Sequence, residues 1–343
     1  MELSREAYQL IVQNIGNKAD LCTLARVSKP FQFAAERALY NTLYMRDPGE
    51  TVTLCKLLAS QHRLAIHVDA LTVFVNEGLS DNEPSDKDDG YDQADEADEV
   101  GGGKTFPDNY WEALAGALQR TIRLRFFNLH IDGDPSHAWI LRDCTFKLRT
   151  FHCDLAWDEH LVSFLDTQNR LEDLYLADYA VISTLVDTGP AVIQVRDPEC
   201  EAPPPGTPTS PLSTPASQYG EQVFSTMQSS VVHPVTVIDG RALSALSTLE
   251  CSFADAFTTF TPGRPIARVK TCFSREDSAG KAQELTQLLG SLRRSSRPIR
   301  CLDLADSSYT EEFSLTVLGE VTRYLLELQY LGTLVLPVGR EVC

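Results

Sequence analysis

Residues 171–178 read LEDLYLAD and residues 299–306 read IRCLDLAD. Both stretches follow one order, which is apolar, two variable, apolar, one variable, apolar, and both then continue with Ala-Asp. The alternation of apolar and variable positions predicts a β-strand with one buried face. Unrelated strands would rarely share the longer word, so the two stretches predict a repeated structural unit.

The same six-position pattern recurs along much of the chain. Its copies are Val68-Leu71-Val73, Leu148-Phe151-Cys153, Leu171-Leu174-Leu176, Leu246-Leu249-Cys251, Ile299-Leu302-Leu304 and Leu331-Leu334-Leu336. In two of the wide gaps between copies we expect weaker copies, around residues 122–126 and around Ile266 and Val269. Cys153 and Cys251 occupy apolar positions of the pattern, which favours core cysteines over metal ligands.

Apolar residues at helical spacing fill the segments between copies, as in residues 158–168 and 281–294. Strand then helix, at intervals of 23 residues from Leu148 to Leu171 and 32 from Ile299 to Leu331, resembles an irregular leucine-rich-repeat solenoid. In four copies the asparagine or cysteine that this family places after each strand is absent, because Ala156, Tyr179, Ser307 and Gly339 stand there, so we do not expect its hydrogen-bonded ladder. The predicted class is α/β, with an α/β layer without true repeats as the alternative.

The first 45 residues carry three short amphipathic helical patterns with little loop between them. Ser4 is placed to cap a helix with an apolar stripe at Tyr8, Ile11, Val12 and Ile15. Asp20 then begins a second helix, and Ser28 caps a third. Three such helices bury little apolar surface, so the unit should need a neighbour or a partner.

This N-terminal region resembles an F-box of the large fungal, basidiomycete-type families. The resemblance lies in Leu3-Ser4-Arg5-Glu6, Ile11, Asp20-Leu21, Leu24, Val27-Ser28-Lys29, Phe31 and the run from Ala35 to Tyr40. It implies docking to a Skp-type adaptor, and through it to a cullin ligase, by Leu3, Glu6, Ile11, Leu24, Val27 and Phe31. The chain would then be the substrate-recognition adaptor of an SCF-type ubiquitin ligase, with the array binding a target protein and no catalytic residue or cofactor of its own. The alternative is a non-ligase interaction scaffold whose N-terminal helices only cap the array.

Residues that alternate with the apolar positions should point to the solvent side of the strands. They would place His152, Asp154, Asp173, Tyr175, Glu250 and Asp303 on one concave surface, which we take as the candidate target-binding face. Its carboxylates predict a basic or polar partner with Tyr175 as aromatic anchor. The alternative is that these are merely solvated strand residues.

Composition sets the domain map of this 343-residue chain, whose net charge is −18. The stretch from Asn76 to Glu99 contains eleven acidic residues and one basic residue, Lys87, which gives a net charge of −10. We therefore expect residues 76–107 to be a disordered acidic insertion that repels nucleic acid. A Pro/Ser/Thr-rich insertion at about 198–222 should also be disordered. The remaining parts are a helical module at 1–45, a linker helix with the first strand at 46–75, and the array at 108–343.

Sequence features that suggest chemistry or a membrane fail on inspection. Gly101-Gly102-Gly103-Lys104-Thr105 resembles a phosphate loop, but Asp98 stands where its opening glycine is required. A calcium-loop reading around Gly90 would need Lys87 as a ligand, and a zinc motif at residues 157–160 would need a histidine at Ala156. No apolar run reaches ~18 residues, no secretion signal opens the chain, and the nine cysteines are an odd number without paired spacing. We therefore expect an intracellular protein, cytoplasmic or nuclear, without a membrane partner, a metal site or catalytic residues.

Overall fold

The structure is a computed structural model, and it describes residues 3–76, 106–177, 238, 241–252, 255–305, 310–332 and 334–335. The acidic tract and the phosphate-loop and calcium-loop look-alikes lie outside the described residues, and so does the Pro/Ser/Thr-rich stretch. Expectations about those segments therefore remain predictions from sequence.

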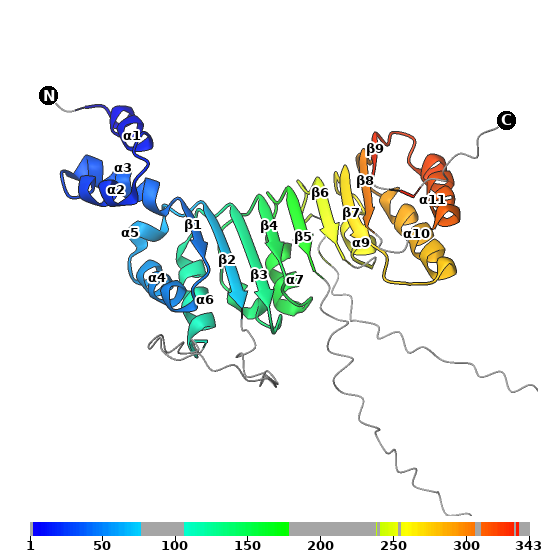
Figure 1. Cartoon of the computed structure of the whole chain (residues 1–343), viewed down its shortest axis with the longest axis horizontal. Coiled ribbons are helices and arrows are strands. Elements are labelled where there is room, and N and C mark those ends of the chain that lie inside the picture. Colours follow the sequence, from blue (N-terminus) through cyan, green and yellow to red (C-terminus); the bar gives the residue numbers. More distant parts are fainter. Residues whose placement is uncertain are drawn as a thin grey trace, which may run out of the picture.

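Nine strands form one sheet in which strand order follows chain order and every adjacent pair is parallel (Figure 1). The strands are β1 (Thr42–Met45), β2 (Ala70–Asn76), β3 (Phe126–Asp132), β4 (Thr150–Cys153), β5 (Asp173–Leu176), β6 (Thr248–Cys251), β7 (Arg268–Cys272), β8 (Cys301–Ala305) and β9 (Tyr330–Leu331). The predicted α/β class is confirmed. A sheet that adds each strand beside its predecessor arises when a chain stacks successive strand and crossover units.

The crossovers between these strands are mainly helical. They hold α4 (Pro48–Ser60), α5 (His62–Ala65), α6 (Tyr110–Arg120), the 3₁₀ turn η1 (Ala138–Leu141), α7 (Glu159–Asp166), α9 (Asp255–Phe260), α10 (Ser278–Leu292) and α11 (Glu311–Tyr324). Figure 1 shows α4, α6, α7, α9 and α10 along one side of the sheet, and in the described ranges no helix covers the opposite face. The helices predicted from residues 158–168 and 281–294 correspond to α7 and α10. Asp158 caps α7 by accepting a hydrogen bond from the Leu161 N–H at 2.8 Å.

The six-position pattern marks the buried face of the sheet. Every apolar position of the five copies from Val68 to Leu304 is buried, Cys153 and Cys251 included. The helices complete the same core with residues such as Leu58, Leu118 and Leu289. Burial of one such leucine side chain contributes roughly 1.5–3 kcal/mol, so the repeated pattern supplies much of the fold's stability. In the last copy Leu331 and Leu334 pack against the core, whereas Leu336 lies outside the described residues.

Two expectations about the pattern need correction. The first strand of the sheet is β1, inside the segment assigned to the helical module, and Tyr40, Leu43 and Met45 supply an unrecognised copy on the core side. The weak copy near residues 122–126 is shifted, because Leu124, Phe127 and Leu129 are the buried set, while Ile122 and Phe126 are exposed. The copy expected at Ile266 and Val269 is present in β7.

Polar side chains tie consecutive units together in the turns before the strands. The fully buried Gln168 accepts a hydrogen bond from the Leu148 N–H at 2.9 Å. Ser247 donates to the carbonyl of Glu172 at 3.0 Å, and the Ser295 hydroxyl lies 2.9 Å from each of two carbonyls in the preceding unit's turn. These residues occupy different positions in their units, so no regular spacing marks them in the sequence.

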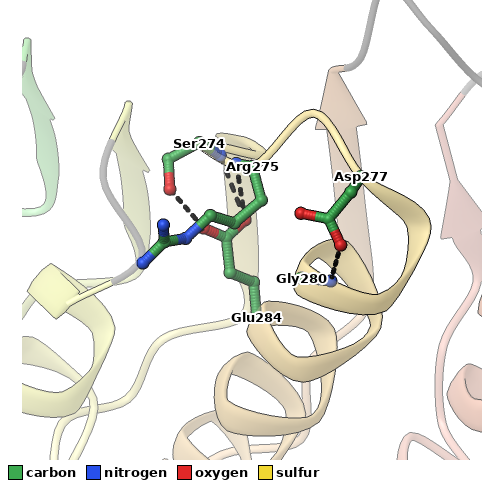
Figure 2. Close-up of polar contacts among 5 residues, drawn as sticks. All are labelled: Ser274, Arg275, Asp277, Gly280 and Glu284. Atoms are coloured by element: carbon green, nitrogen blue, oxygen red, sulfur yellow. Dashed lines mark hydrogen bonds and ion pairs between the residues drawn. The ribbon is translucent and has the colours of Figure 1, made fainter. Parts of the chain in front are cut away.

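Glu284 closes the turn that leads from β7 into α10 (Figure 2). Its carboxylate accepts hydrogen bonds from the N–H groups of Ser274 at 3.0 Å and Arg275 at 3.5 Å and from the Ser274 hydroxyl. Asp277 caps α10 through the Gly280 N–H at 2.7 Å. A Cβ on Gly280 would lie 2.8 Å from the Asp277 carboxylate and 2.9 Å from the Arg275 side chain, so the helix and turn approach this closely because glycine is present.

Candidate protein-binding surfaces

Three helices precede the sheet, namely α1 (Arg5–Gln13), α2 (Lys18–Leu24) and α3 (Lys29–Tyr40). Ser4 and Ser28 cap α1 and α3 as predicted. The second helix is capped by Asn17 and begins earlier than the predicted start at Asp20. The first helix ends at Gln13, so Ile15 follows it and packs on the small core of the module from outside the helix.

The three helices enclose a core of their own, separate from that of the sheet. Its buried members are Val12, Leu21 and Ala34. The rings of Tyr8 and Phe31 meet edge to face beside it, with centroids 4.7 Å apart. So small a core gives limited stability, which agrees with the expectation that the module leans on a neighbour or a partner.

The six residues predicted to bind a Skp adaptor divide into two groups. Leu3, Ile11 and Val27 are exposed by 51%, 41% and 65%, and Glu6 is exposed as well. Leu24 and Phe31 are half-buried and pack against the module's core, so they support the surface from within. Ile11 therefore lies outside the buried stripe in which helical spacing had placed it.

An open groove of about 410 Å³ runs between α1 and the start of α3. Its apolar lining consists of Leu3, Tyr8, Pro30, Phe33 and Ala34. The guanidinium of Arg5 lies over the Phe33 ring, 4.9 Å from its centroid. Exposed apolar side chains gathered around a groove are typical of a surface that another protein covers.

Helix α3 attaches this module to the first units of the sheet (Figure 1). The Phe33 ring meets the imidazole of His67 edge to face at 5.0 Å, and Glu36 forms an ion pair with Arg63 of α5. Burial lowers the pKa of His67, and its Nε2 has no hydrogen-bond partner among the described residues. His67 is therefore a neutral packing residue at this junction.

The residues predicted for the concave surface lie together on the helix-free face of the sheet, which we call the open face. Register pairs His152 with Tyr175, Tyr175 with Glu250, Glu250 with Lys270, and Lys270 with Asp303, so they form one row across β4 to β8. Asp173 and Asp154 occupy the outward positions on either side of that row, in β5 and just after β4. All six predicted residues are half-buried.

The charges of the open face are more balanced than its carboxylates alone predicted. The Lys270 Nζ lies 2.5 Å from the Glu250 Oε1, and this hydrogen bond raises the pKa of Lys270. Asp154 lies 3.6 Å from the Nδ1 of His130, and Asp173 lies 3.4 Å from the Nε2 of His152. Lys270 therefore balances Glu250, whereas a histidine balances a carboxylate only when it is protonated.

Tyr175 occupies the middle of this face. Its ring lies 5.9 Å from that of His152, edge to face. Burial raises the pKa of Tyr175, and the nearby carboxylates of Asp154 and Glu250 raise it further. No hydrogen bond joins its hydroxyl to another of the described residues.

Asp303 stands apart from that central group. A Cβ on Gly332 would clash with its carboxylate, so the side chain leans toward the end of β9. Of the predicted residues, Asp303 is therefore the one that belongs to the rim of the face.

Sequence reasoning missed several residues of the open face, among them Arg46, Phe74, His130 and Lys270. The Arg46 guanidinium lies 4.8 Å from the centroid of the Phe74 ring, and that ring stacks on the imidazole of His130 at 5.1 Å. Phe74, His130 and Lys270 hold outward positions of β2, β3 and β7. The alternation rule, extended to the weak copies of the pattern, would have identified them.

No protein-family model matches the chain, and no curated protein matches it. Among the described residues, no three His, Cys, Asp or Glu side chains lie close enough to hold a metal ion. Within residues 157–160, Asp158 caps α7, and Glu159 and His160 are its first two helical residues. None of the helices in the described ranges has the length and apolar character that a membrane crossing requires.

Proposed function

We propose that this protein is the target-recognition adaptor of an SCF-type ubiquitin ligase. In this proposal the N-terminal module is an F-box that docks to a Skp adaptor, and the strand and helix units are a leucine-rich-repeat-like array that holds a target. One observation carries it, which is that Leu3, Ile11 and Val27 are exposed on a module whose sequence resembles an F-box, and that Leu3 also lines the α1–α3 groove.

The physical argument starts from the cost of exposed apolar surface. A partner that covers it gains roughly 25 cal/mol for each Å² of apolar area removed from water. Exposed aliphatic side chains therefore favour docking, while the exposed Glu6 of α1 adds a charge that can select the partner. The chain needs no catalytic residue for this role, because holding a target near the transferring enzyme raises the effective concentration of its lysines.

The test is co-purification of the full chain with a Skp adaptor. Because Leu24 packs on the module's core, the informative double variant is Ile11→Asp with Val27→Asp, whose side chains are exposed in the free chain. We expect this variant to keep its circular dichroism spectrum and lose the adaptor, since two carboxylates would be desolvated in the interface.

A matched control places the same new charge at the far end of the molecule. Leu326 follows α11 and is 86% exposed, so Leu326→Asp should leave adaptor binding unchanged. Undiminished adaptor binding by the folded double variant would refute the docking role of this surface. Failure of the unaltered chain to bind any Skp adaptor would refute the ligase proposal itself.

A second candidate, an interaction scaffold capped by its N-terminal helices, has one observation in its favour. Helix α3 packs on the sheet's first units through Phe33 and Glu36, and Ala35 is fully buried. A solenoid needs such a cover at its ends. A pure cap would, however, also bury the side chains of Leu3, Ile11 and Val27, and their exposure favours the adaptor.

A further inference from the structure

We propose that the open face binds a lysine or arginine side chain of a protein segment on the Tyr175 ring, between the carboxylates of Asp154, Asp173 and Glu250. This deepens the proposed function, on which it rests only for calling the bound segment a ligase target. The site itself lies in β4 to β6 and does not involve the N-terminal helices.

Tyr175 lies among carboxylates that come from neighbouring strands. Three neighbouring strands bring three carboxylates around one half-buried aromatic ring, and two of those carboxylates raise the pKa of Tyr175 through their charge. A ring face attracts a cation through its quadrupole, and an acidic surround strengthens that attraction.

The open face already holds one cation over an aromatic ring. Arg46 lies over Phe74, whose other neighbour is the imidazole of His130. Tyr175 has an imidazole neighbour as well, in His152, but no cation of the described residues lies over its ring. Phe74 thus shows that an aromatic ring on this face can hold a cation, although His130 stacks on Phe74 whereas His152 meets Tyr175 edge to face.

The carboxylates around Tyr175 also favour a cationic ligand. Lys270 already compensates Glu250, while Asp154 and Asp173 face histidines at 3.6 Å and 3.4 Å. Any negative charge left on these two aspartates favours a cationic ligand and repels an acidic one. A neutral isostere of arginine would keep the shape and hydrogen bonds but lose this attraction.

The experiment measures fluorescence anisotropy of the full chain with a labelled Gly-Ser peptide that carries three arginines. Its counterpart carries three citrullines, which are nearly isosteric and neutral. The chain's net charge of −18 attracts any cationic peptide, so the decisive variants keep the charge unchanged. These are Tyr175→Leu, which removes the ring, and Tyr175→Phe, which keeps it. Tyr44→Leu is the matched control, because Tyr44 is 70% exposed and lies on the same face in β1.

We expect the arginine peptide to bind at least about tenfold more tightly than the citrulline peptide. Tyr175→Leu should weaken the arginine peptide by about fivefold or more, whereas Tyr175→Phe and Tyr44→Leu should stay within about twofold of the unaltered chain. Asp173→Asn should also weaken it, which gives a second measurement should Tyr175→Leu not fold. Equal binding of the two peptides, no measurable binding of either, or loss in Tyr44→Leu as large as in Tyr175→Leu would overturn the proposal. Adaptor binding is scored separately, so failure of this site leaves the docking result standing.

Discussion

Replacement of Gln168 by leucine tests whether buried polar links between units hold the array together. Gln168 is fully buried and accepts the N–H of Leu148, which is itself buried, while its amide nitrogen lies 3.4 Å from the Phe146 carbonyl. Leucine fills similar space but leaves the Leu148 N–H without an acceptor, at a cost of about 1–3 kcal/mol. Loss of the longer hydrogen bond to the Phe146 carbonyl increases this cost slightly, and burial of the apolar leucine side chain offsets part of it. We expect a net loss of about 2 kcal/mol, which lowers the melting temperature by about 4–8 °C.

Thermal unfolding followed by circular dichroism measures this loss, and hydrogen exchange of a peptide spanning residues 146–150 locates it. The matched control is Gln119→Leu, because Gln119 makes an exposed bond of 3.4 Å to the Arg142 carbonyl and should lose less than about 0.5 kcal/mol. Equal melting temperatures for the two variants would refute the reasoning. So would unchanged protection of the Leu148 amide in Gln168→Leu.

Three further predictions concern α10, the turn before it and the buried thiols. Gly290→Ala should stabilise the chain by about 0.5–1 kcal/mol, because a Cβ there meets nothing within 4 Å. Gly280→Ala in the same helix should destabilise the chain by about 1 kcal/mol or more, because its Cβ would clash with Asp277 and Arg275. Melting temperatures of the two variants that shift in the same direction would contradict this prediction. Glu284→Ala should speed amide exchange in the turn at Ser274 and Arg275 by tenfold or more while leaving exchange in β4 unchanged, since it removes the acceptor of both N–H groups. Burial raises the pKa of the Cys55, Cys144 and Cys153 thiols to about 12. In the unfolded chain a thiol has a pKa of about 8.5, so deprotonation favours unfolding above that pH. The stabilisation from keeping these thiols protonated is therefore complete below pH ~8.5 and is lost as the pH rises toward 12. Urea midpoints should therefore fall between pH 8.5 and 10.5, and fall less steeply in Cys153→Ala, and an identical slope in that variant would contradict the assignment.

The buried face of the sheet was predictable because strand alternation places side chains on opposite faces without further information. The limits appear where two registers are both apolar. Residues 122–129 contain apolar side chains in either register, and only packing against the neighbouring strands shows that Leu124 and Phe127 go inside. The predicted start of α2 at Asp20 was wrong for a similar reason. Asn17 and Asp20 are both good N-cap residues, and the geometry of the preceding turn decides between them.

Parts of the open face were predictable, and others were missed either where the pattern is weak, as in β7, or where the alternation was not followed to the end of a strand, as at Phe74. His152, Tyr175 and Glu250 come from clear copies, whereas Lys270 comes from β7, whose third core position is the polar Thr271. The charge balance of the face depends on that missed lysine. Contacts such as Arg46 over Phe74 join residues far apart in the sequence, so they follow from the sheet and cannot be read from spacing alone.

The two proposed surfaces are joined by a continuous sheet, and this matters for the proposed ligase. The N-terminal module attaches at the β1 end, and Tyr175 lies four strands away in β5. With neighbouring strands about 4.8 Å apart, that separation is about 20 Å along the sheet. The strands between them are hydrogen-bonded in a single parallel ladder, so a target cation on Tyr175 would be held at a fixed distance from the adaptor. A rigid spacer of this kind would favour ubiquitin transfer to target lysines at one particular distance from the bound segment. Proximity raises the effective concentration only of those groups that the geometry can bring together.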